Sequence, residues 1–406
     1  MTFGIYIQIP FCQTKCTYCN FHTGVVSRDR YEPYANAICQ EIRELACVGH
    51  PGRQEPTTGV NGDGLMHGTT REAADTIYFG GGTPSLLDLT ALARIIGSVQ
   101  ETFSLSAEPE ITLEADPETI TPEKASGWRA TGFNRISLGV QSFSDVELKA
   151  AGRMHRRGDV FRATEFLRRA ELANISMDLI AGLPHQTRES WQASVGEMIS
   201  LRPEHVSIYM LEIDEGSRLG RESLAGGTRY NAPAIPSDDD IAEFYESACD
   251  RLVIAGYEHY EISNWALPGF RSRHNLKYWR REPYLGFGAG AHSFDGRTRW
   301  ANVHDAAKYA ACIEQGTSPR EQVEQVSPEQ ALEEEFFTGL RQLEGIDLAR
   351  IESLYGSSGL REKLASLRVR IDDLRRQGLV ELQGIRLRLA PDRLTVSNEV
   401  FVALLD

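Results

Sequence analysis

Three cysteines stand close together near the start of the sequence, in PFCQTKCTYCNFH (residues 10–22). Cys12, Cys16 and Cys19 form a C-x3-C-x2-C array directly after an apolar run. Three thiolates at this spacing suit three corners of a [4Fe-4S] cluster and leave one iron open to another ligand. The alternative is a zinc ion completed by His22. Structural zinc sites usually pair ligands from two separated segments, and the sequence has no second such segment.

Other residues with possible ligand chemistry follow later β-rich runs. YFGGGTPS (78–85) contains a glycine triplet, which lets backbone approach a ligand closely. Glu114 could accept hydrogen bonds from two sugar hydroxyls, and Gln141 and Asp178 lie in or just after apolar runs. Buried polar side chains need partners, and a ligand is one such partner, although each of the three could instead cap a helix.

An aromatic block, SRHNLKYWRREPYLGFGAGAHSF (272–294), contains His274. From the residues alone, a core histidine among packed aromatics is the favoured interpretation, because aromatic runs are usually buried.

Alternating β-rich and helical patterns must position these residues. Each β-rich run is followed by a helical stretch, which predicts six βα units and a parallel sheet, either doubly wound or curled into a partial barrel. The barrel is favoured because the polar residues follow strand after strand, and a barrel gathers all strand ends at one mouth. The predicted strands are 3–9, 76–80, 110–116, 133–140, 174–182 and 205–211.

Two weakly patterned segments interrupt this series. Residues 51–70 are rich in Gly, Thr and Pro and are predicted to form a surface insertion without chemistry, and 216–237 is predicted to close the series. The prediction is an α/β fold with a partial (βα)6 barrel in 1–235, an accessory segment in 236–300 and a C-terminal domain in 301–406.

The C-terminal domain is predicted to be helical and winged-helix-like, because helical patterns lead into VELQGIRLRLAP, which resembles a hairpin. Residues 361–393 contain nine Arg or Lys against five Asp or Glu, so a DNA-binding face is an alternative to a solvated basic face.

Composition narrows the function classes. The 406 residues carry a net charge of −14, which would repel a phosphate backbone, so nucleic acid is not the expected partner. Seven cysteines, three of them clustered, indicate a metal site in a reducing compartment rather than a disulfide framework. We find no signal peptide and no spanning segment, which predicts a cytoplasmic protein.

The stretch YIQIPFCQTKCTYCNF resembles the signature of radical S-adenosylmethionine (SAM) proteins, in the branch that contains oxygen-independent coproporphyrinogen III oxidase and the HemW-type haem chaperones. The resemblance covers nearly the whole chain. It implies a [4Fe-4S] cluster on the three cysteines, with SAM on the open iron, and a haem ligand at His274, in an H-N-x-x-Y-W motif with Asn275, Tyr278 and Trp279. It implies that the residues contacting SAM are Tyr6, Gly80, Gly81, Gly82, Thr83, Glu114, Gln141, Arg153 and Asp178. For the haem ligand, His155 and His292 are further candidates with less support.

The resemblance leaves two functions to compare. One is a chaperone that binds haem as cargo and passes it to an acceptor protein, with an exchangeable SAM and an electron donor to the cluster. The other is the oxidase, which oxidatively decarboxylates coproporphyrinogen III by SAM-derived radical chemistry; whether this chain cleaves SAM productively stays open.

Four features favour the chaperone. Phe21 stands where the oxidase has a fourth cysteine, few residues precede Cys12, and the H-N-x-x-Y-W block is present. Gln8 replaces the usual histidine of the family, and an amide cannot titrate near neutral pH.

Overall fold

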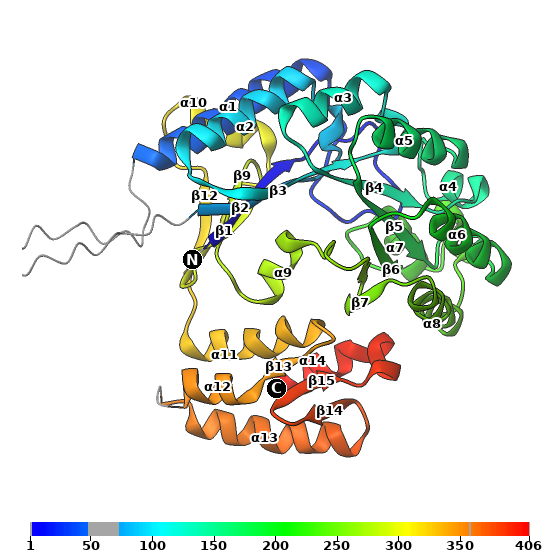
Figure 1. Cartoon of the computed structure of the whole chain (residues 1–406), viewed down its shortest axis with the longest axis vertical. Helices are drawn as coiled ribbons and strands as arrows, with labels where there is room; N and C mark the ends of the chain where they lie inside the picture. Colours follow the sequence, from blue (N-terminus) through cyan, green and yellow to red (C-terminus); the bar gives the residue numbers. More distant parts are fainter. Residues whose placement is uncertain (1, 48–72, 357–358, 406) are drawn as a thin grey trace, which may run out of the picture.

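The computed structural model describes residues 2–47, 73–356 and 359–405. Within these ranges, six parallel strands neighbour one another in the order of the sequence. An unbroken order has no switch point of the doubly wound type, so the sheet curls as a partial barrel, and the predicted fold is confirmed (Figure 1). The strands are β1 (Thr2–Ile9), β2 (Ala73–Gly81), β3 (Leu105–Ala115), β4 (Arg135–Gln141), β5 (Asn174–Ala181) and β6 (His205–Met210).

Helices cover the outer face of this sheet, and α1, α2 and α3 pack in a row over β1 to β3 (Figure 1). Strand side chains alternate between the two faces. On β1, Ile5, Ile7 and Ile9 are completely buried, whereas Tyr6 and Gln8 face the concave side. The helices are α1 (Tyr31–Cys47), α2 (Leu89–Thr102), α3 (Pro122–Thr131), α4 (Asp145–Ala150), α5 (Arg157–Arg169), α6 (Arg188–Leu201), α7 (Arg218–Leu224) and α8 (Asp238–Ile254).

Short strands extend the sheet at both edges. Beside β6 lie β8 (Asn264–Ala266) and then β7 (Glu258–Glu261), both antiparallel to their neighbours. Beside β1 lies β9 (Tyr284–Phe287), which is parallel to it. The sheet continues antiparallel through β10 (His292–Phe294), β11 (Thr298–Asn302) and β12 (Arg320–Gln325), and α10 (Ala306–Glu314) connects the last two.

The C-terminal part forms a separate helical module that lies below the barrel in Figure 1, with α9 (Arg273–Trp279) between them. The predicted hairpin is confirmed as β14 and β15, which turn at Gly384, where φ is +61°. The elements of the module are α11 (Pro328–Phe337), β13 (Ile346–Asp347), α12 (Leu348–Tyr355), α13 (Arg361–Arg376), β14 (Val380–Gln383), β15 (Arg386–Leu389) and α14 (Ser397–Leu405).

Short 3-10 segments complete the described elements. They are Arg28–Arg30, Pro84–Leu86, Pro117–Thr119, Arg229–Ala234 (η4), Gly339–Arg341 (η5) and Pro391–Val396. The predicted insertion at 51–70 lies outside the described residues, and the predicted boundaries at 235 and 300 stay predictions. None of the described helices combines the length and the apolar composition needed to cross a bilayer.

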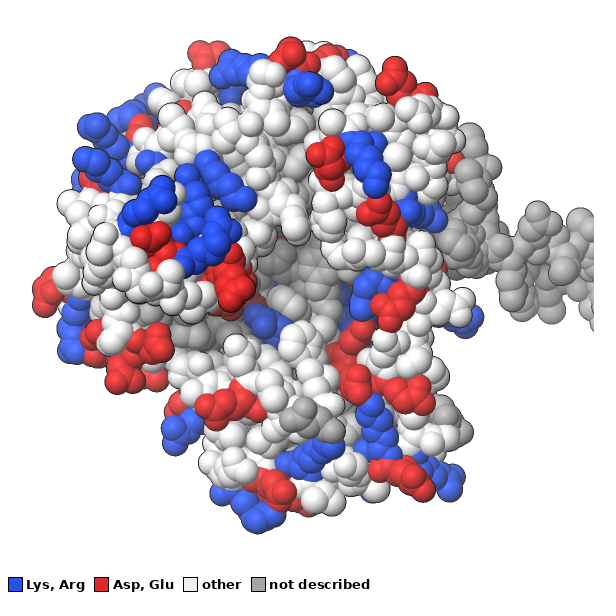
Figure 2. Space-filling model, turned by 180° about the vertical axis from the view of Figure 1, so that it is seen from behind, with Lys and Arg blue, Asp and Glu red and all other residues white. Residues whose placement is uncertain are grey.

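The basic residues of the C-terminal module stand next to acids. Arg368 pairs with Glu352, Arg375 with Asp372, Arg376 with Asp373 and Arg388 with Glu381. On the rear face of the molecule, positive and negative side chains are also interspersed (Figure 2). A phosphate backbone binds to concentrated positive charge, so this arrangement disfavours the DNA-binding alternative.

Candidate functional site

The three cysteines lie on a loop that leaves the end of β1. The base of the loop is closed by backbone hydrogen bonds, from Cys12 N to Gly24 O (3.0 Å) and from Gly24 N to Pro10 O (2.8 Å). Thr17 anchors its middle, since its N–H donates to Ala151 O (2.9 Å) and its carbonyl accepts from Leu219 N (2.8 Å). The loop is therefore fixed from both the α4 side and the α7 side.

The thiols are partly buried on this loop. Burial raises the pKa of Cys12. The Arg153 Nη1 donates to Cys16 Sγ at 3.5 Å. Three thiol donors on a braced loop next to a guanidinium fit the electron-rich sulfur ligands of an iron–sulfur cluster.

The zinc alternative receives no support from the arrangement of side chains. His22 instead lies against His304, with 4.3 Å between the ring centroids.

The glycine triplet (80–82) lies at the end of β2 and packs directly on the start of the cysteine loop. Gly82 N donates to Ile9 O (2.8 Å) and Thr83 N to Phe11 O (2.7 Å). A Cβ on Gly82 would stand 2.6 Å from Phe11 O, and Gly81 has a φ of +109°. Only glycine satisfies both positions, because one needs space against backbone and the other a left-handed conformation.

Arg153 connects this turn to the next strands. Its Nη2 donates to Asp116 Oδ1 and to Gly139 O (2.8 Å), and Asp116 Oδ2 accepts from Thr83 Oγ1 (3.0 Å). The Nε of Arg153 is buried and finds no hydrogen-bond partner among the described residues. An unused buried donor beside the cysteine loop fits the carboxylate of a ligand such as SAM.

Two carboxyl groups face the concave side of the sheet, Glu114 on β3 and Asp178 on β5, with β4 between them. Glu114 accepts from Tyr78 Oη (2.8 Å) and from Gly81 N (3.1 Å), and burial raises its pKa to about 7. Burial also raises the pKa of Asp178 to about 6, and hydrogen bonds with Ser207 and Ser137 offset part of that effect. The two carboxyls repel one another, which is a common condition of binding and catalytic sites.

Gln141 ends β4 in a strained conformation. Its φ of +65° lies in the left-handed region, at a position where the pairing of β4 with β5 shifts register. Such strain in a residue other than glycine concentrates at functional sites.

His274 lies on α9, against the concave face of β1 and β2. Its side chain is buried, with Nδ1 hydrogen-bonded to Thr76 Oγ1 (2.8 Å) and Nε2 to Tyr278 Oη (2.8 Å). Burial, with a smaller effect from the charge of Lys277, lowers its pKa to about 3. The ring stacks on Tyr78 (5.1 Å) and Tyr6 (6.2 Å), so the predicted haem residue adjoins predicted SAM residues.

His155 and His292 lie apart from this stack. His155 is buried, its Nε2 contacts Val140 O (2.9 Å), and burial lowers its pKa to about 4. His292 is exposed at the start of β10.

Two neighbours of the predicted residues escaped the sequence analysis. Tyr78 holds Glu114, and Asp116 joins Thr83 to Arg153. Both could have been found from the strand pattern, because residues two apart on a strand lie on the same face of the sheet. Tyr78 precedes Gly80 by two residues, and Asp116 follows Glu114 by two.

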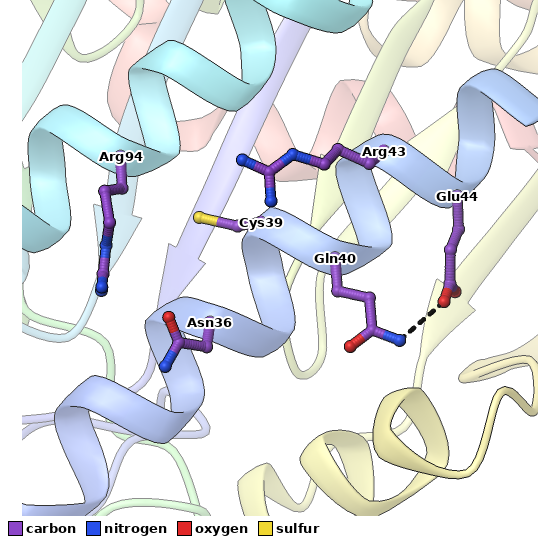
Figure 3. Close-up of a pocket in the computed structure, with 6 residues that line it drawn as sticks. All are labelled: Asn36, Cys39, Gln40, Arg43, Glu44 and Arg94. Carbon is purple, nitrogen blue, oxygen red and sulfur yellow. Dashed lines mark hydrogen bonds between the residues drawn. The ribbon is translucent and has the colours of Figure 1, made fainter.

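A surface pocket lies elsewhere, in the outer helix layer (Figure 3). Arg43 and Arg94 reach into it from α1 and α2, and Gln40 donates to Glu44 at 2.7 Å. None of the predicted site residues lines this pocket.

Comparisons with known proteins identify the family of the chain. The family model of the radical SAM superfamily matches residues 6–197, and the HemN C-terminal domain matches residues 326–392. The heme chaperone HemW of Bacillus subtilis is 34% identical over 98% of this chain and 98% of its own length. HemW of Escherichia coli is 34% identical over 71% of this chain and 69% of its own.

A solved structure shows the same fold. The coproporphyrinogen III oxidase HemN from Escherichia coli, described as a radical SAM enzyme, superposes with a TM-score of 0.80 and covers 99% of this chain and 90% of its own. It is 21% identical, so it supports the fold and not the activity. With relatives of this identity along its whole length, the chain belongs to the HemW family of radical SAM proteins.

Proposed function

We propose that this protein is a haem chaperone, which binds haem as cargo and passes it to an acceptor protein. The observation that carries the proposal is the 34% identity to a heme chaperone HemW over 98% of both chains. We further propose a cytoplasmic location, and an electron donor as a second partner of the protein.

Within this proposal, Cys12, Cys16 and Cys19 hold a [4Fe-4S] cluster whose open iron takes SAM. Such a cluster, when bound, supplies electrons to SAM, and that chemistry belongs to the cofactors. The chain itself orients the ligands. The free Nε of Arg153 would meet the carboxylate of SAM, and the backbone of the glycine triplet would bind its amino end.

The concave face would bind the remainder of SAM. Glu114 can accept hydrogen bonds from both ribose hydroxyls when ionised, which its pKa near 7 allows at neutral and higher pH. The remaining contacts would come from Tyr6, Gly80, Thr83, Gln141 and Asp178.

His274 is proposed as the axial ligand of haem iron. Because both ring nitrogens carry hydrogen bonds, ligation at Nε2 requires Tyr278 to move away. Tyr278→Phe should therefore speed haem association at this site, and His274→Ala should weaken haem retention. An unchanged haem spectrum and affinity for His274→Ala would place the ligand elsewhere.

The cluster is tested by anaerobic reconstitution. Replacement of any one of the three cysteines by alanine should abolish the brown absorbance, whereas Cys249→Ala, a partly buried thiol on α8, is a matched control that should keep it. A full iron content in the triple variant would contradict the assignment.

Chaperone and oxidase are separated by one incubation of the reduced, reconstituted protein with SAM, haem and coproporphyrinogen III. The chaperone should retain haem, release it to apo-myoglobin and leave the coproporphyrinogen unchanged. Formation of protoporphyrinogen would overturn the proposal in favour of the oxidase.

A further inference from the structure

Three histidines from distant parts of the sequence gather beside the cysteine loop. His22 follows Cys19 by three residues, His304 stands between β11 and α10, and His292 begins β10. The rings of His22 and His304 are 4.3 Å apart and tilted by 38°. His292 pairs with Ala301 of β11, three residues before His304, so β10 and β11 bring these two histidines to the same edge of the sheet.

The imidazoles of His22 and His292 are exposed, and among the described residues no side-chain hydrogen bond engages either ring. The Nδ1 of His304 is buried without a partner, so a surface ligand could reach the His304 ring only through its other atoms. His274, by contrast, uses both of its nitrogens inside the protein. A Cβ at Gly290 would come within 3.0 Å of His304 Nδ1, so the glycine leaves that nitrogen its space.

The loop that carries His22 also exposes apolar side chains. Phe21 is 66% exposed, Val25 59% and Val26 37%. Lys15, Arg28 and Arg30 add positive charge to the same segment. Haem has an apolar macrocycle, an iron that takes an axial base and anionic propionates, so this segment offers one chemical partner for each part.

The number of ligands favours haem iron over a bare metal ion. A protein-bound divalent transition metal usually takes three or four side chains, and in the described part of the chain no such group converges here. Haem iron already has four porphyrin nitrogens and needs only one or two axial ligands.

We propose that His22 and His304, with His292 beside them, form a second haem-binding site at the surface next to the cysteine loop, where incoming or outgoing haem is held by imidazole ligation of its iron. The inference rests on the proposed function, because haem is the cargo there. It adds a solvent-facing site to the buried His274, which is screened by Tyr278 and α9.

The test compares His22→Gln/His304→Gln with the wild type in haem titrations followed at the Soret band. His185→Asn is the matched control, because His185 is an exposed histidine in a left-handed conformation that asparagine tolerates. The double variant should bind haem about tenfold more weakly or more slowly, as expected for loss of an axial ligand. The control should match the wild type, as should the melting temperatures of all three proteins.

Two further probes identify what the histidines recognise. Iron-free protoporphyrin IX should bind the wild type and the double variant equally, because the imidazoles contact iron. If the double variant binds protoporphyrin as much more weakly than wild type as it binds haem, the histidines act by packing and not by iron ligation, and the inference is overturned. Loss of Zn²⁺ binding with unchanged haem binding would make this a metal-ion site and would overturn it as well.

Failure of the inference is distinguishable from failure of the function. If wild type retains no haem at all, the proposed function fails. If wild type and the double variant retain haem equally while His274→Ala does not, the function stands and the surface site is wrong.

Discussion

Arg153 is the side chain through which most segments of the site contact one another. It reaches Asp116 after β3, Gly139 on β4 and Cys16 on the cysteine loop. Its side chain is 10% exposed and that of Asp116 20%, so solvent screens this ion pair only weakly.

We expect Arg153→Met to destabilise the protein by about 3 kcal/mol, because it leaves Asp116 without its cation in a mostly buried place. Iron retention after reconstitution should fall as well, since Cys16 loses its donor. Urea unfolding and iron analysis check this. Arg162→Met is the control, because Arg162 makes an exposed pair with Asp159 and should cost at most about 0.5 kcal/mol. Equal losses in both variants would contradict the role given to Arg153.

Glu114 makes the stability of the folded protein depend on pH. Its pKa is about 7 in the folded protein and about 4.3 in an unfolded chain, so between these values the folded state binds the proton more tightly. The stability that this proton provides is fully present below about pH 4 and is lost as the pH rises through 7. Glu114→Gln cannot titrate, so its free energy of unfolding should rise relative to wild type by up to about 2 kcal/mol from pH 5 to 8.

Chemical denaturation at several pH values measures this difference. Glu108→Gln, at an exposed position on β3, should keep a constant difference from wild type. A constant difference for Glu114→Gln as well would show that Glu114 does not titrate in this range.

Sequence predicted the site residues unevenly. Glu114 and Asp178 stood out because a carboxylate in an apolar strand run needs a partner. Asp116 and Tyr78 were missed because EADP reads as a turn and a tyrosine in a strand reads as core. The gathering of His22, His292 and His304 was not accessible from sequence, since it depends on how β10 and β11 dock beside the cysteine loop.

At the scale of elements, the cysteine loop and the glycine turn after β2 act as one unit. Gly82 N donates to Ile9 O and Thr83 N donates to Phe11 O, and neither hydrogen bond involves a side chain. The position of the thiols therefore depends on the close approach of these two backbones.

Gly82→Ala should disturb this unit. Its Cβ would meet Phe11 O at 2.6 Å and Ile9 O at 2.9 Å, so the cysteine loop must shift, at a cost of about 1 to 3 kcal/mol. Gly97→Ala in α2 is the control, because nothing lies within 4 Å of its Cβ and alanine should stabilise the helix by about 0.5 to 1 kcal/mol. Gly82→Ala should lower both the melting temperature and the iron content after reconstitution. Gly97→Ala should raise the melting temperature, and equal effects of the two variants would contradict the role given to Gly82.

Strands of the barrel could be predicted because each is a long apolar run followed by a helical pattern. The short strands β7 to β12 could not, because three to six residues show too little periodicity and YLGFGAGAHSF is rich in glycine. These strands form through pairing with the edges at β6 and β1, which is tertiary context.

At the scale of the whole molecule, α9 separates the barrel from the C-terminal module and contacts both. Arg281, just after α9, adopts a φ of +51° and donates to Glu334 of α11 at 2.8 Å. Glu334 also accepts from Arg299 of β11 (2.9 Å), and Glu335 accepts from Arg350 of α12 (2.7 Å). This ionic cluster thus joins the barrel, α9 and the module.

We expect Glu334→Gln to loosen the module without unfolding the barrel. The change removes the carboxylate that both Arg281 and Arg299 contact. The Arg281 side chain, 11% exposed, then keeps one carboxylate, Glu335 at 3.7 Å, and a long hydrogen bond to Tyr355 Oη (3.5 Å). Breaking a partly buried pair from one side costs more than removing an exposed one, so opening of the module should become about tenfold more frequent, or about 1.4 kcal/mol. Hydrogen exchange should show this as faster exchange in α11 to α14, with β1 to β6 unchanged.

Glu321→Gln supplies the comparison, because Glu321 pairs with Lys308 at the surface, where the side chains are 43% and 62% exposed. Its exchange pattern should match wild type, since screening leaves such a pair little energy. Unchanged exchange in α11 of Glu334→Gln would mean that apolar packing alone holds the module. Faster exchange throughout the barrel would mean that module and barrel unfold as one unit, because the ionic cluster would then stabilise both and could not act as a separable connection between them.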